Sequence, residues 1–323
     1  MNNKVDKRTS TGVIPIEELD LRICATCGTQ FAGKSSPDSC PICEDERQYV
    51  PPDGQKWTSI RNLQDSGFNL EIRSLEENLL GIALQPDFAI GHRALIVRTP
   101  EGNLMWDAVP LINDEAIGAL KRIGGIHAIA VSHPHFFTSM VGWSRVFGEI
   151  PIHLPKSAEP WVMRPDASIE FYPGDRKPLF GGLSLHRTGG HFDSSQVLHW
   201  PAGAQGKGVL LTTDEPFVTP GGDNVSFMYS FPNAIPLDAS RIRGIAETLA
   251  PLDYDCIYSG WWNKVLRSDA KKIVKRSIDR YLDILNGRLN PTETPSGIRN
   301  MEDSSAAGTN VRNKPRSCNE STS

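Results

Sequence analysis

The segment that most constrains the fold is Ile126–Thr138, which reads IHAIAVSHPHFFT. Its apolar first half, with the β-branched residues Ile129 and Val131, is typical of a buried strand. Two histidines one residue apart, His133 and His135, follow directly. Because side chains alternate along an extended backbone, this spacing places two imidazoles on one side of the chain. Neutral imidazole is the commonest nitrogen ligand of zinc, so the segment predicts the start of a metal site, with a pair of ordinary loop histidines as the alternative.

Length and charge restrict the classes of function that are open to this chain. Its 323 residues can bury a sizeable core, as one large domain or a large domain with a small one. A net charge of -4 and a pI near 6.1 give no general electrostatic basis for binding nucleic acid or an anionic membrane. No apolar run approaches the roughly 20 residues that span a bilayer, and the polar N-terminus lacks a secretion signal. We therefore expect a cytoplasmic protein, with a nuclear location left open.

Four of the six cysteines form a second candidate metal site. Cys24 and Cys27 make one C-x-x-C pair, and Cys40 and Cys43 make another after an intervening turn-rich segment. Each pair can direct two thiolates at one ion, which predicts a closed tetrahedral site, with a redox dithiol pair as the alternative. The segment resembles a zinc ribbon, or the rubredoxin-type knuckles that bind iron. We expect a structural zinc ion here, with iron as the second choice.

The composition divides the chain into four parts. Residues 1–20 are expected to be disordered, and residues 21–50 to form the four-cysteine module. Residues 51–286 alternate strand and helix patterns and form the main domain. Residues 287–323 are rich in Ser, Asn, Thr, Pro and Gly with few large apolar side chains, which predicts a disordered tail.

Strands and helices can be placed within the main domain. The expected helices are Asp114–Ile123 with an Asn113 cap, about Thr138–Phe147, a short helix capped by Asp238 or Ser240 and ending at Leu249, and Ser268–Leu285 with Ser268 as its cap. The expected strands are Asn78–Gln85, Ala94–Arg98, Leu104–Trp106, the strand at Ile126, Pro151–Leu154, three segments after Ile169, and Tyr254–Tyr258.

Three of these strands end in a candidate metal ligand. The strand at Ile126 is followed by His133 and His135, a later strand by His191 after two glycines, and the strand Val209–Thr213 by Asp214. Loops at strand ends gather at one edge of a sheet protein, so we expect these side chains to meet.

This order of strand ends and ligands resembles the metallo-β-lactamase superfamily, over about Asn78–Leu285. The resemblance implies an α+β fold, an αββα sandwich of two sheets with outer helices, preceded here by the four-cysteine module. It places the active site at one edge of the sandwich. It also implies a hydrolase that uses one or two metal ions.

The match to the family's H-x-H-x-D-H pattern is partial. The first two histidines are present, but Phe137 stands in place of the aspartate and Thr138 in place of the next histidine. Near Gly260–Trp261, where the family has its final histidine, this chain has none.

The residues that do match define one metal site. His133, His135, His191 and Asp214 correspond to the ligands of the first metal, and Asp107 to an aspartate that supports the site from behind the ligands. The resemblance therefore implies at most one metal ion at the active edge, with zinc the expected ion, and attack by a metal-bound hydroxide on a small ester, thioester or lactone.

With Phe137 in place of the aspartate, activation of water falls to other groups. Asp193 and Glu215 are weak candidates, with ordinary loop carboxylates as the alternative interpretation.

Three other functions stay open at this point. The missing ligands favour a non-catalytic protein that binds a ligand or partner. The knuckle pair resembles that of flavodiiron oxygen reductases, but no flavin domain is visible. A nucleic-acid-processing enzyme is disfavoured by the acidic pI.

Overall fold

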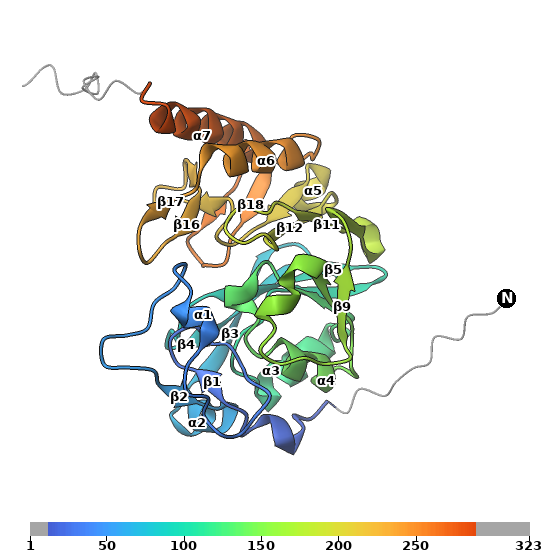
Figure 1. Ribbon diagram of the computed structural model, residues 1–323. Helices are drawn as coiled ribbons and strands as arrows, with labels where there is room; N and C mark the ends of the chain where they lie inside the picture. The colour runs from blue at the N-terminus through green and yellow to red at the C-terminus, as the bar shows by residue number, and fades with distance from the viewer. Residues whose placement is uncertain (1–11, 289–323) are drawn as a thin grey trace, which may run out of the picture.

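Two β-sheets form the inner layers of the structure, a computed structural model that describes residues 12–288. Helices α3 (Asp114–Arg122) and α4 (Met140–Val146) cover the outside of the first sheet. Helices α6 (Ala239–Leu249) and α7 (Ala270–Leu285) cover the outside of the second (Figure 1). The predicted αββα sandwich is confirmed.

The first sheet has seven strands in sequential order. Neighbouring strands are antiparallel from β3 to β6 and parallel from β6 to β9. Their bounds are β3 (Asn69–Glu76), β4 (Leu79–Gln85), β5 (Arg93–Thr99), β6 (Gly102–Trp106), β7 (Ala128–Ala130), β8 (Ile152–Pro155) and β9 (Ile169–Tyr172).

The second sheet has six strands in the order β10-β11-β12-β13-β18-β19, of which only the β13–β18 pair is parallel. Their bounds are β10 (Arg176–Pro178), β11 (Ser184–Arg187), β12 (Gln196–Trp200), β13 (Val209–Leu211), β18 (Cys256–Tyr258) and β19 (Val265–Leu266).

Alternation along the strands builds the layers. On β5, Leu95 and Val97 pack between the two sheets, whereas Ile96 packs in the cluster shared with α3 and α4. On β13, Leu211 faces the other sheet and Leu210 packs in the cluster shared with α6 and α7. Each such side chain, when fully buried, stabilises the fold by roughly 1.5–3 kcal/mol.

Helix caps follow the sequence signals at two of three positions. Asn113 accepts a hydrogen bond from the Ala116 amide, and Asp238 caps α6, so both predictions are confirmed. The predicted cap at Ser268 is wrong, because α7 begins at Ala270 after Asp269, whose φ is 54°. The left-handed turn at Asp269 reorients the chain one residue after Ser268.

Short elements connect the layers. They are η1 (Ile16–Glu18), β1 (Ile23–Cys24), α1 (Pro41–Glu44), β2 (Trp57–Thr58), α2 (Ile60–Asp65), η2 (Pro134–Phe136), η3 (Lys156–Trp161), η4 (Phe180–Gly182), α5 (Gly203–Gly206), β14 (Phe217–Val218), β15 (Val225–Ser226), β16 (Met228–Ser230) and β17 (Ile235–Pro236).

The four-cysteine module packs against the main domain. Its core consists of the four cysteines, Phe31 and Ile42, and this cluster contacts Trp57, Ile90, Trp161 and Met163. Strand β1 pairs with β2, which joins the module to the start of the main domain. The module therefore shares part of its apolar surface with the sandwich.

Most of the predicted disordered N-terminus and tail lies outside the described residues. Within 12–20, however, Ile16–Glu18 forms a short helix, and the side chain of Glu18 is fully buried against Arg145 and Arg164. The prediction of disorder does not hold there. In the described part of the chain, no helix combines the length and apolarity that crossing a membrane requires.

Candidate metal centre

The first two candidate ligands lie where β7 ends. His133 is extended, with φ −168°, and Pro134 then starts the 3-10 helix η2, which contains His135. The two imidazoles therefore approach each other across a turn, and the expected side-by-side placement on an extended backbone is wrong. Both side chains are buried, with ring centroids 5.1 Å apart.

The other two ligands reach the same point from the second sheet. His191 lies in the loop between β11 and β12, and Asp214 follows β13. Asp214 Oδ2 lies 3.1 Å from His133 Nε2, 4.0 Å from His135 Nδ1 and 3.6 Å from His191 Nε2. His191 Nε2 and His135 Nδ1 are 3.3 Å apart.

These separations fit a single ion. A tetrahedral zinc site with bonds of about 2.0–2.1 Å has donor atoms about 3.3 Å apart. The four donor atoms lie within 4.8 Å of one another, and all four residues are buried. The measured distances between donor atoms lie on both sides of the donor spacing expected for tetrahedral zinc, so the residues present fit zinc.

The protonation states also suit a cation. Burial lowers the pKa of His133 to about 4 and that of His191 well below its ordinary value. Burial alone would raise the pKa of Asp214, but hydrogen bonds from His133 and His135 outweigh it and hold that pKa well below its usual range. Near neutral pH His133 and His191 are therefore neutral and Asp214 is ionised, and these are the forms that bind metal.

Asp107 and Ser132 fix the position of His133. Asp107 adopts φ 64° at the end of β6, and its Oδ1 accepts a hydrogen bond of 2.7 Å from the Ser132 amide. The Ser132 hydroxyl lies 3.0 Å from His133 Nδ1, which turns Nε2 towards Asp214. Asp107 thus supports the site through the chain and not by direct contact with an ion.

His191 is held at three of its atoms. Its Nδ1 donates to the Met228 carbonyl at 3.0 Å, which leaves Nε2 free to bind an ion. Its backbone amide donates to the Glu215 carboxylate, and its carbonyl accepts from Arg47 Nη1 at 3.3 Å.

A cavity of about 320 Å³ adjoins the cluster and is lined in part by His135, His191 and Asp214. Its volume is at the lower end of the range of small-molecule sites. Its other lining residues are mainly aromatic or polar: Arg47, Gln48, Ile90, Phe217, Phe231, Pro232, Trp261, Asn263 and Lys264.

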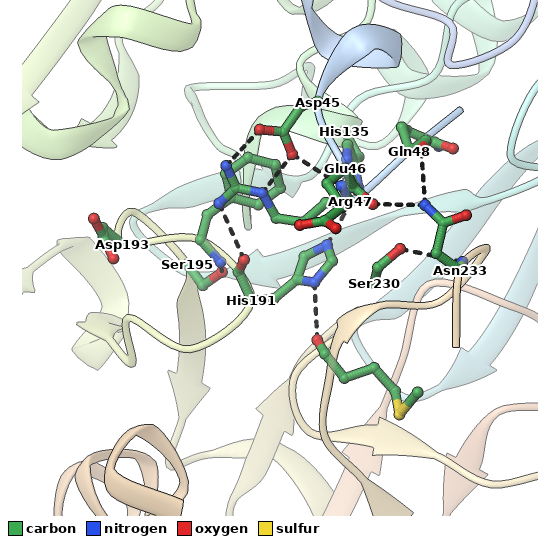
Figure 2. A network of polar contacts seen from close by, with 12 residues as sticks. Asp45, Glu46, Arg47, Gln48, His135, His191, Asp193, Ser195, Ser230 and Asn233 are labelled. Carbon is green, nitrogen blue, oxygen red and sulfur yellow. Dashed lines mark hydrogen bonds and ion pairs between the residues drawn. The ribbon is translucent and has the colours of Figure 1, made fainter. Parts of the chain in front are cut away.

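The two carboxylates that were weak candidates for activating water lie elsewhere. Glu215 is buried behind the loop of His191, and burial raises its pKa to about 7. The Asp193 side chain is 77% exposed and pairs with Arg241 at 3.7 Å. Figure 2 shows Asp193 at the outer end of the polar network, away from His135. Neither residue lines the cavity.

The positions where the resemblance would place ligands of a second metal are occupied by side chains that pack or form hydrogen bonds with the backbone. Phe137 is buried in the apolar cluster under α3 and α4, and the Thr138 hydroxyl donates to the Ala108 carbonyl at 2.8 Å. Trp261 lines the cavity and donates from Nε1 to the Ile90 carbonyl at 3.3 Å. Among residues 12–288, this cluster and the four cysteines are the two groups in which three or more histidine, cysteine or acidic side chains place their ligand atoms within 4.8 Å of one another.

The remaining five histidines lie outside the cluster and contact other protein groups. Each ring contacts a carbonyl, amide, hydroxyl or carboxylate, at Ala108 for His92, Asn103 for His127, Glu170 for His153, Ser184 for His186 and Asp253 for His199.

The four cysteines also form a cluster that fits one ion. Cys24 and Cys43 are separated by 3.5 Å between sulfurs, and Cys27 and Cys40 by 3.7 Å. Four thiolates at about 2.3 Å from a zinc ion would be about 3.8 Å apart. All four are free thiols in a buried site.

Sequence reasoning missed Arg47 and Gln48 in the cavity wall. They follow the second C-x-x-C pair and reach the site only because the module docks beside the metal cluster. No motif spacing in the sequence predicts that the module packs beside the metal cluster.

Two solved structures are similar to this chain, and the first of them supports the fold. The crystal structure of VMB-1 matches with a TM-score of 0.50 and 15% identity, covering 67% of this chain and 98% of VMB-1. A crystal structure of DIM-1 metallo-β-lactamase exposed to ceftazidime has a TM-score of 0.49 and 13% identity, covering 66% and 98%. At such identities the likeness concerns the fold alone.

One curated relative is much more similar in sequence. The uncharacterized protein YmaE of Bacillus subtilis (strain 168) is 42% identical over 270 residues, which are 83% of this chain and 97% of YmaE. No protein-family model matches the chain. With this identity and coverage, the chain belongs to the same family as YmaE, and its fold is that of the metallo-β-lactamases.

Proposed function

We propose that this protein is a metal-dependent hydrolase of a small ester, thioester or lactone, with one zinc ion at the active edge. The observation that carries the proposal is the convergence of three imidazoles and one carboxylate beside a small cavity that His135, His191 and Asp214 line. A zinc ion bound there would polarise a carbonyl group and lower the pKa of bound water to about 7.

The side chains of the cavity have separable roles in this proposal. Phe217, Phe231 and Trp261 offer an apolar surface for the substrate and exclude water around it. Lys264 and Asn263 place a cation and an amide on the same wall, where they can orient a polar group of the substrate. Asp214 is the one carboxylate among the described residues that line the cavity.

Metal content per chain tests the two sites. We expect two metals in the wild type and one in the double variant His133→Ala/His135→Ala, because the thiolate site does not depend on these side chains. The protein is expected to be colourless, because zinc is the ion expected in the four-thiolate site. Iron in that site would make the protein red. One metal in both proteins would contradict the site assignment.

Activity tests the reaction class. Three proteins are compared on matched ester, thioester and lactone substrates. They are the wild type, the double histidine variant, and wild type from which a chelator has removed the active-edge metal but not the thiolate-bound one. Hydrolysis should require the active-edge metal and return when zinc is restored. Activity that is equal in the stripped and loaded protein would contradict the proposal.

One observation favours a second function, a non-catalytic protein that binds a ligand or partner. Asp214 supplies a fourth protein ligand, and zinc sites with four protein ligands are usually structural, whereas catalytic sites keep a position open. In that case the cavity would bind small molecules without turnover, and binding would be measured with no hydrolysis in either metal state.

A further inference from the structure

The segment that leaves the four-cysteine site ends in the wall of the other site. Cys43 lies in α1 (Pro41–Glu44), and Arg47 and Gln48 follow it by a few residues. Both line the cavity together with His135, His191 and Asp214. The segment Glu44–Gln48, which we call the strap, therefore leads directly from the four-cysteine site to the wall of the cavity at the histidine cluster.

Arg47 anchors the strap to the loop of His191. Its guanidinium donates to the His191 carbonyl at 3.3 Å and lies 3.8 Å from the ring centroid of Phe192. Two further donor atoms form a fork with Asp45 at 2.6 and 2.8 Å, which fixes the orientation of the guanidinium plane. The Arg47 side chain is 12% exposed, so these contacts are largely shielded from water.

A second contact ties the strap to the hairpin that orients His191. Asn233 Nδ2 donates to the carbonyls of Glu46 at 2.8 Å and Gln48 at 3.3 Å (Figure 2). Asn233 lies between β16 and β17, and β16 also contains Met228, whose carbonyl accepts from His191 Nδ1. The strap, the hairpin and the loop of His191 thus form one hydrogen-bonded unit.

The position of the strap depends on the thiolate site. The apolar cluster around the cysteines is small, and its buried members besides the cysteines are Phe31 and Ile42. In small modules of this kind, metal binding supplies much of the folding free energy. Without an ion, four buried thiols hold α1, and with it the start of the strap, only weakly.

We propose that the ion bound by the four cysteines organises the active edge: through the strap, it sets the position of Arg47, which in turn positions His191. Arg47 is a positioning residue, because it contacts the backbone of a candidate ligand and not the ion. The proposal rests on metal binding at both sites, as proposed above, but not on hydrolase activity. It predicts that the histidine cluster binds metal more tightly when the four-cysteine site holds its ion than when that site is empty, and that this effect depends on the strap.

The test measures Co²⁺ binding at the active edge without any substrate. Full-length protein is stripped of metal at the active edge, with zinc kept in the thiolate site of every protein except Cys40→Ser. It is then titrated with Co²⁺, and the visible absorption of the histidine-bound ion gives a dissociation constant. Cobalt that entered the thiolate site would be recognised by its intense sulfur-to-metal absorption. The variants are Arg47→Ala, Cys40→Ser and the control Arg61→Ala, whose arginine pairs with Asp20 outside the cavity.

We expect Arg47→Ala to weaken binding at the histidine cluster about 10- to 100-fold, the usual effect of removing a group that orients a ligand. Zinc in the thiolate site should be unchanged in that variant. Cys40→Ser should lose the thiolate-bound ion and weaken the histidine cluster by a similar factor. Arg61→Ala should match the wild type.

Equal dissociation constants in wild type and Arg47→Ala would overturn the proposal, even if the protein hydrolyses esters. If Cys40→Ser does not fold, Asn233→Ala replaces it, because it removes the second contact of the strap and leaves the cysteines intact. Asn233→Ala is then expected to weaken the histidine cluster, and an unchanged constant would count against the strap. These binding constants are measured without substrate, so a hydrolase screen that fails would leave the role of the strap unaffected.

Discussion

Gly190→Ala should damage the active edge through a collision with a buried carboxylate. A Cβ at Gly190 would overlap the Glu215 carboxylate, lying 2.5 Å from its Cδ and 2.8 Å from Oε1. Ordinary contact begins near 3.4 Å, so the carboxylate has to move by about an ångström. Glu215 is buried, and any such shift weakens the hydrogen bond that it accepts from the His191 amide.

The magnitude follows from the two effects. Inserting a methyl group into a closed site costs roughly 1–3 kcal/mol, and losing a hydrogen bond to a charged group costs roughly 1.5–3 kcal/mol. We therefore expect the free energy of unfolding to fall by about 3–5 kcal/mol, and metal affinity at the histidine cluster to fall about 10-fold or more because the backbone of His191 moves.

Urea unfolding and metal titration measure the two effects, with Gly244→Ala as the matched control. Gly244 lies inside α6, and an added Cβ there meets no atom within 4 Å. Alanine in a helix interior is favoured over glycine by up to about 1 kcal/mol, so the control should be slightly stabilised. If Gly190→Ala unfolds at the same urea concentration as the wild type, the assigned packing of Glu215 is wrong.

Two further predictions concern buried charge. Glu18→Ala should lower the free energy of unfolding, measured in urea, by roughly 3–5 kcal/mol, because it leaves the buried Arg164 without its carboxylate. The control Asp20→Ala breaks only an exposed ion pair and should change the free energy little. Similar urea midpoints of unfolding for the two variants would refute this prediction. Burial lowers the pKa of His92 to about 4, below its ordinary value of 6.5, so the unfolded state binds the extra proton and stability should fall as pH drops from about 6.5 to 4. The loss should be shallower in His92→Gln by roughly 2–3 kcal/mol, and parallel stability curves for the two proteins would contradict the assignment.

The elements that sequence could predict are those whose pattern is complete within the segment. Helix α7 repeats apolar residues on one face, and β5 is buried on both faces, so both were predictable. The edge strand β3 was not, because it is half exposed and alternates weakly. Strand β12 was also missed, since its five buried residues carry no turn signal of their own.

The candidate site divides in the same way. His133 and Asp214 follow buried strands, and strand ends can be located from sequence. Arg47 enters the cavity through packing of the module against Trp161 and Ile90, a contact between segments far apart in the chain. Such docking depends on shape and not on local pattern, so residues that arrive by it cannot be found from motifs.

The burial of Phe137 has a consequence for stability. Its side chain belongs to the apolar cluster under α3 and α4, and the neighbouring Thr138 hydroxyl is bonded to the Ala108 carbonyl. A Phe137→Asp substitution would bury an unpaired carboxylate in that cluster, with no second ion there to stabilise it. Replacing Phe137 by a metal-binding aspartate is therefore expected to destabilise the fold unless the surrounding side chains change with it.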